Sequence, residues 1–177
     1  TFAPEKPGTL ILPEGLGEES QSKRIQLKRT AIAVTTKNNI HTLNINSNRM
    51  LHSSGFIAKV FDAFRHHGVV IDLISTSEVN ISCTVNDPDE LDDLTRDLEE
   101  LGTVTVLGER AILSLVGEGM RTTPGTVGKM FSALAEEGIN IEMITQGASE
   151  INISCVILQS QTSEALKAIH RAFLENQ

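Results

Sequence analysis

The chain has 177 residues, a formal net charge of −8 at pH 7, and neither Trp nor Tyr. The negative charge and the lack of aromatic stacking platforms argue against a nucleic-acid partner. No apolar run reaches the length of a membrane span and no signal peptide is evident, so we expect no membrane partner. We expect a cytoplasmic protein, or a mature organellar one whose transit peptide has been removed, in the plastid if the source is a plant or alga.

The first 22 residues are punctuated by Pro and Gly and are expected to form a linker. From residue 39 to 107 the pattern predicts strand, helix, strand, strand, helix and strand, with alternating polarity in strands and three- and four-residue spacing in helices. The strands are predicted at 40–47, 69–75, 79–85 and 104–107, and the helices between Phe56 and Gly68 and between Asp87 and Gly102. This order predicts a ferredoxin-like unit, in which a four-stranded antiparallel sheet carries both helices on one face.

A second unit follows with the same order of elements, but it lacks the last strand. Its strands are predicted at 111–116, 139–145 and 151–158, with one helix beginning at Thr123-Pro124 and another containing Leu166, Ile169, Phe173 and Leu174. A further strand at 31–36 precedes the first unit and has no partner there. Because an unfilled sheet edge leaves backbone groups unpaired, we predict that 31–36 completes the second sheet. The fold class is therefore predicted to be α+β, with the first unit inserted into the second.

An internal repeat supports this division. The segment SEVNISC at 77–83 returns 72 positions later as SEINISC at 149–155, and 67–75 matches 137–145 at an offset of 70. A repeat of this length has the size of a small domain. Small domains are marginally stable alone, so we expect the two copies to share a surface with one another.

No catalytic set or metal-ligand spacing is apparent in the sequence. Cys83 and Cys155 occupy the same place in the two repeats and are expected to be core residues. The histidines have no evident catalytic context, and the glycine-rich segments at 117–119 and 125–129 lack the spacing of a phosphate-binding loop. We therefore predict no catalytic residue and no metal site.

A small-molecule site is suggested by residues 50–57 and by Asp72. Gly55 precedes a predicted helix, and the N-terminus of a helix holds carboxylates well. Asp72 lies in an otherwise apolar stretch, where a carboxylate is costly unless it is paired. A bound amino acid would match, with its carboxylate on the helix and its ammonium on Asp72. On residue types alone, Asp72 could equally point to solvent at a sheet edge.

Three segments resemble the tandem ACT domains of aspartate kinases: 48–61, 70–79 and 137–154. The resemblance covers about Arg29 to Glu175, and residues 2–11 resemble the end of the kinase domain of that family. It implies three parts. These are a linker or kinase-domain end at 1–24, an effector-binding first ACT domain at 39–107, and a second ACT domain made of 25–38 plus 108–177.

The resemblance further implies the regulatory region of an enzyme that uses ATP to make 4-phospho-L-aspartate, the first step toward lysine, threonine, methionine and isoleucine. An end-product amino acid would bind at the ACT interface and inhibit the kinase. The kinase motifs are absent, so this chain is not expected to phosphorylate anything; it holds no cofactor, and ATP and Mg belong to the kinase domain. The positions that match the family's effector contacts are Met50, Ser53, Gly55, Phe56, Ile57, Asp72, Thr76, Ser77 and Glu78.

The sequence leaves open which amino acid is the effector and whether the chain is part of a kinase, a separate regulatory subunit or another kind of protein. The segment 50–56 is similar to lysine-regulated members and favours lysine slightly, whereas 139–155 is at least as similar to fungal members, in which threonine is the usual inhibitor. The expected partners are the effector, the chain's own kinase domain, and a second copy in a homodimer through the ACT domains. A separate regulatory subunit is an alternative. An acylphosphatase-like hydrolase using Arg121 and an RNA-binding sheet are weaker ones.

Overall fold

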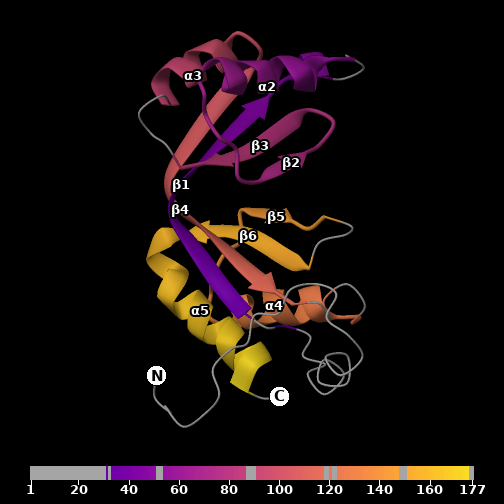
Figure 1. Ribbon diagram of the computed structural model, residues 1–177, viewed down its shortest axis with the longest axis vertical. Helices are drawn as coiled ribbons and strands as arrows, with labels where there is room; N and C mark the ends of the chain where they lie inside the picture. Colours follow the sequence, from indigo (N-terminus) through magenta and orange to yellow (C-terminus); the bar gives the residue numbers. More distant parts are fainter. Residues whose placement is uncertain are drawn as a thin grey trace, which may run out of the picture.

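The computed structural model describes residues 31, 33–50, 54–86, 91–117, 120, 123–147 and 151–175. Figure 1 shows two units, one above the other, with helices at the two outer ends and strands facing each other in the middle. We call residues 40–107 the first unit, and residues 33–37 together with 110–175 the second unit.

Two long strands run through both units and join them. β1 (Ala33–Asn46) and β4 (Thr103–Val116) pair antiparallel, from Ala33 opposite Val116 to Asn46 opposite Thr103. The predicted pairing is confirmed, because residues 33–37 of β1 lie against residues 112–116 of β4.

The prediction of separate strands on either side of Asn38-Asn39 was wrong. The register of β1 shifts between Lys37 and Thr42, and Asn39 takes a left-handed φ of 58° there. In β4 the matching bend is at Glu109, which takes φ 56°. Glu109 lies 70 positions after Asn39, the same offset as between 67–75 and 137–145 in the internal repeat. One residue of positive φ in each strand bends the chain without taking it out of the sheet, so each strand serves both units.

The remaining strands extend β1 and β4 into one six-stranded sheet, in which each unit uses four strands because β1 and β4 run through both. The strand order is β2-β3-β1-β4-β6-β5, with β2 and β5 at the edges. In the first unit the elements are η1 (Asn48–Met50), α2 (Phe56–His66), β2 (Ile74–Thr76), β3 (Asn80–Val85) and α3 (Leu91–Glu99). In the second they are α4 (Thr126–Glu136), β5 (Met143–Thr145), β6 (Asn152–Leu158), η3 (Gln159–Gln161), α5 (Thr162–His170) and the π-helical η4 (Arg171–Glu175).

Each unit has its own hydrophobic core between its sheet and its helices. In the first unit, α2 buries Phe56, Val60 and Phe64, which recur every four residues and so form one face of the helix. In the second unit, Met130 and Leu134 of α4 do the same against β4 and β6. A third cluster, which we call the boundary cluster, consists of Ile40, Ile112, Met143 and Val156 with Leu73 packed against them. The boundary cluster contains residues of both units and thus packs one against the other.

Three predicted elements were too long. Residues 69–73 and 139–142 are not strands, and the regular ladders with β3 and β6 are confined to β2 and β5. Before β2, the N–H of Leu73 donates to Oγ1 of Thr84 at 2.9 Å, so a side chain replaces a ladder bond. The helix expected from Thr123-Pro124 begins at Thr126, because Gly125 takes φ 83° and lies outside the helix. Residues 87–90, predicted to begin the helix before Leu91, lie outside the described residues.

The two cysteines are expected to be unreactive in the folded protein. Both side chains are fully buried, and burial raises the pKa of the Cys83 thiol and of the Cys155 thiol to about 12. Only the thiolate attacks alkylating reagents, so at pH 8 the native protein should resist iodoacetamide, whereas protein unfolded in guanidinium should take up two labels. Mass spectrometry counts the labels. Rapid labelling of the native protein would contradict the assignment of both thiols to the cores.

Candidate functional site

The predicted effector residues that the structure describes lie at one end of the first unit's part of the sheet, except for Asp72. We call this end, where β1 stops opposite Asn80, the hairpin end. Here the N–H of Ser47 donates to the carbonyl of Val79 at 2.9 Å, and the N–H of Ser77 donates to that of Asn80 at 2.8 Å. The predicted residues at this end are Met50, Gly55, Phe56, Ile57, Thr76, Ser77 and Glu78. Ser53 lies outside the described residues.

The N-terminus of α2 gives the hairpin end its positive character. Gly55 precedes the helix with φ 85°, a conformation that favours glycine, and it has no side chain with which to cap the first turn. The first N–H groups of a helix have no partner within it, and the helix dipole adds partial positive charge there. Phe56 is buried in the core, which fixes the helix, whereas Ile57 is exposed. The site thus offers backbone donors to a carboxylate, beside an apolar side chain.

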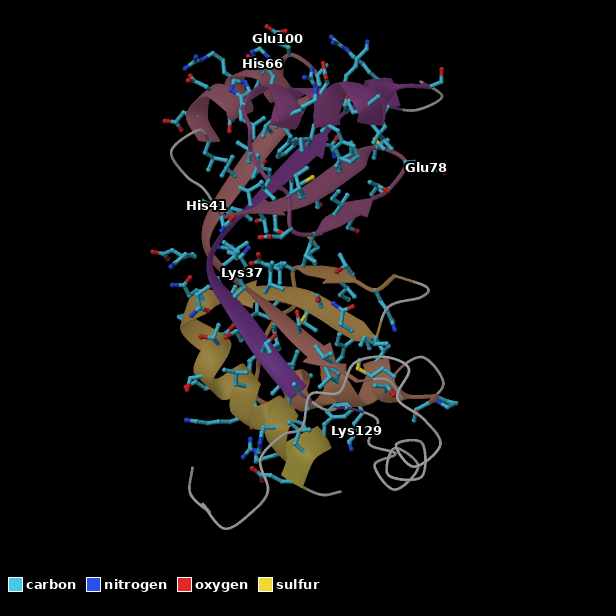
Figure 2. The ribbon with its side chains drawn as sticks, viewed as in Figure 1. Lys37, His41, His66, Glu78, Glu100 and Lys129 are labelled. Carbon is cyan, nitrogen blue, oxygen red and sulfur yellow. The ribbon has the colours of Figure 1, made fainter. Side chains whose placement is uncertain are left out.

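Asp72 lies at the opposite end of β3, near the boundary between the units. Its N–H donates to the carbonyl of Thr84 at 2.9 Å. Both carboxylate oxygens accept hydrogen bonds from Nζ of Lys37 at 2.7 Å. Figure 2 shows Lys37 near the boundary and Glu78 at the outer rim of the first unit. From Thr84 to Asn80 is four strand steps, or about 13 Å at 3.3 Å per residue.

The N-terminus of α2 and the carboxylate of Asp72 in a single chain are therefore too far apart to bind the same amino acid, whose carboxylate and α-ammonium share a carbon atom. A second copy can. β2 is an edge strand, and its residue Ile74 is 42% exposed. Val70, four residues before the start of β2, is 70% exposed. If two β2 edges pair antiparallel about a two-fold axis, the Asp72 end of one copy meets the hairpin end of the other.

Comparisons with known proteins agree with this architecture. The family model of the ACT domain matches residues 43–92 and 113–173. The chain belongs to the ACT domain family. It is 30% identical to the regulatory subunit of aspartate kinase from Thermus thermophilus, in its ligand-free form, with a TM-score of 0.71 over 82% of this chain and 99% of that one.

Two longer proteins are similar as well. The aspartokinase of Saccharomyces cerevisiae is 48% identical over 168 residues, which are 92% of this chain and 31% of the relative. The structure of E. coli aspartokinase III in complex with lysine and aspartate, in the T-state, is 30% identical with a TM-score of 0.72, over 83% of this chain and 34% of that one. The chain thus spans about a third of the length of these relatives. It corresponds to the tandem ACT regulatory region of aspartate kinases, with two ferredoxin-like units as the sequence predicted.

The second ACT unit carries a different ion pair at the matching place. Glu142 is the repeat equivalent of Asp72, and its two oxygens accept hydrogen bonds from Nε and Nη2 of Arg110 at 2.9 Å each. Nη1 of Arg110 also donates to the carbonyl of Gly108 at 2.7 Å. Such a two-pronged guanidinium–carboxylate pair is stronger and more rigid than one made by an ammonium. The two ACT units are therefore alike in fold and unlike at this position.

Lys37 is the residue near the candidate site that the sequence did not reveal. It lies 35 positions from Asp72, on the part of β1 that pairs with the second unit, opposite Ile112. Nothing local in the sequence marks that contact. Among the described residues, no cluster of three or more His, Cys, Asp or Glu side chains could hold a metal ion. No helix in the described part of the chain is long and apolar enough to cross a membrane.

Proposed function

We propose that this chain senses an end-product amino acid and thereby feedback-inhibits aspartate kinase, the ATP-dependent enzyme that makes 4-phospho-L-aspartate. The observation that carries the proposal is that the first unit presents, at opposite ends of β3, the N-terminus of α2 after Gly55 and a carboxylate, Asp72, that already holds a primary ammonium. An α-amino acid has the two complementary charges. The family resemblance at 48–61 and 70–79 supports the same residues.

The proposed site is shared between two copies of the chain. The carboxylate of the effector would lie on the first turn of α2 in one copy, and its ammonium would lie on Asp72 of the other. Thr76, Ser77 and Glu78 are at the same rim and would contact the remaining polar atoms. An effector held in this way stabilises one arrangement of the two subunits over another. A ligand shifts such an equilibrium by its differential affinity, with ordinary couplings of about 1–3 kcal/mol.

L-Lysine is the first candidate effector, and L-threonine is the second. Lysine is supported by the similarity to E. coli aspartokinase III, which has been solved with lysine and aspartate, and by the match at 50–56. Threonine is supported by the resemblance of 139–155 to fungal members of the family, in which threonine is the usual inhibitor. The 48% identity to the aspartokinase of Saccharomyces cerevisiae agrees with that resemblance.

The kinase chemistry belongs to another part of the protein in this proposal. ATP and Mg would bind a kinase domain that the ACT units regulate, in the cytoplasm or, in a plant or alga, in the plastid. The similarity to the Thermus protein keeps a naturally separate regulatory subunit as the alternative arrangement. The chain alone is then expected to bind the effector without any phosphotransfer.

Calorimetric titration of the purified chain tests the proposal. We expect saturable binding of L-lysine, with L-threonine and L-methionine titrated in parallel and D-lysine as the control for stereospecific recognition. Saturation by threonine alone would keep the proposed function and change the effector. A chain that binds none of these amino acids at millimolar concentration would not be an effector-sensing region.

A further inference from the structure

The carboxylate proposed to hold the effector's ammonium already holds one in the free protein. Nζ of Lys37 lies 2.7 Å from both Oδ1 and Oδ2 of Asp72, and no other hydrogen-bond partner of Nζ is seen within the described residues. The pair joins the two ACT units, because Asp72 belongs to the first unit and Lys37 pairs with β4 of the second. An ammonium on a side-chain tether therefore stands where the ligand's ammonium would bind.

We propose that Lys37 is a built-in counter-ion of the effector site, which the effector must displace from Asp72 in order to bind. The inference rests on the proposed function and adds to it a residue outside the family's effector-contacting positions. In the free protein Lys37 neutralises Asp72 and lowers the apparent affinity of the site. In the bound protein the ligand's ammonium takes its place, and Lys37 turns to solvent.

The exchange is feasible because the pair is partly open to water. The side chain of Lys37 is 44% exposed, and that of Asp72 is 22% exposed. A lysine ammonium is compact, strongly hydrated and carried on a flexible stem, so it can leave at little cost. Asp72 itself stays in place, because its own N–H and that of Leu73 donate to Thr84.

The second unit shows what a pair that does not exchange looks like. There Arg110 is only 16% exposed and donates to both oxygens of Glu142 and to a backbone carbonyl. A ligand ammonium would have to replace several fixed hydrogen bonds at once. The difference between Lys37 and Arg110 therefore assigns the exchangeable carboxylate to the first unit.

Displacement of Lys37 also gives the effector a route to the second unit. The ion pair is a direct polar link between the units, whereas the boundary cluster is apolar and stays packed. Once the effector holds Asp72, that link is gone. The bend at Asn39 in β1, next to Lys37, is the place where the strand can adjust.

Removal of the competing ammonium should tighten effector binding. When a binding-competent state is only partly populated, the apparent affinity falls by that fraction, so a pair formed about four-fifths of the time costs about fivefold. We expect Lys37→Met to lower the Kd of the effector, L-lysine or L-threonine, about fivefold in calorimetry. In an Asp72→Asn background the same change should leave the Kd unaltered, because the two residues act through one contact.

The matched control is Arg110→Met, which removes the equivalent cation from the second unit and should not tighten binding. Lys37→Gln is the second variant if Lys37→Met does not fold, as judged by circular dichroism. If the wild type binds the effector and the folded Lys37 variant binds it equally tightly or more weakly, this inference is overturned and the proposed function stands. Absence of binding in both wild type and variants overturns both.

Discussion

Replacing Asp72 by Ala is expected to weaken effector binding tenfold to hundredfold while the fold stays intact. A hydrogen bond between charged groups contributes about 1.5–3 kcal/mol, and each 1.4 kcal/mol changes a dissociation constant tenfold. The fold is not at risk, because the ion pair with Lys37 is partly exposed and such pairs contribute at most about 1 kcal/mol. Calorimetry gives the affinity, and thermal unfolding gives the stability.

The control for this experiment is Glu142→Ala, at the repeat-equivalent position in the second unit. It also breaks an ion pair between neighbouring segments, but it lies outside the proposed effector site. We expect its effector affinity to match that of the wild type. If Asp72→Ala binds the effector as tightly as the wild type does, Asp72 is not the ammonium anchor and the site lies elsewhere.

Much of the fold follows from local patterns and from the repeat. The stripe of Phe56, Val60 and Phe64 predicts a helix, and its burial in the first core agrees. The missing strand of the second unit predicts a partner, and residues 33–37 of β1 supply it. These inferences succeed because apolar periodicity and unpaired backbone groups constrain the chain wherever one face is buried.

The bends and the ion pairs do not follow from such patterns. Asn39 is a residue type that tolerates positive φ, so a bend there is predictable, but Glu109 takes φ 56° with no local signal. The contact between Lys37 and Asp72 depends on how the two units pack, which residue spacing does not encode. The same holds for the separation of Asp72 from the hairpin end, since a list of matching positions gives no distances.

A homodimer is the second large expectation, with an interface that includes part of 50–57 or of 76–84. The wild-type chain should sediment as a dimer at micromolar concentration. In the first unit β2 is an unpaired edge, and Ile57, Val70 and Ile74 are exposed apolar side chains of that unit. Edges of this kind pair with other chains unless charges or covers prevent it. Two-fold pairing of β2 also completes the proposed effector site.

Ile74→Lys is the substitution that tests the interface. Lysine on an edge strand opposes pairing, and because Ile74 is 42% exposed, the change should leave the core of the first unit unaltered. We expect sedimentation to show a monomer, and calorimetry to show that effector binding is lost with the dimer. The matched variant is Ile144→Lys, the repeat equivalent on β5, which is 47% exposed and should remain dimeric. Dissociation by Ile144→Lys but not by Ile74→Lys would move the interface to the second unit. A wild-type monomer at micromolar protein, with and without saturating effector, would refute the shared site, since one chain holds its two halves at opposite ends of β3.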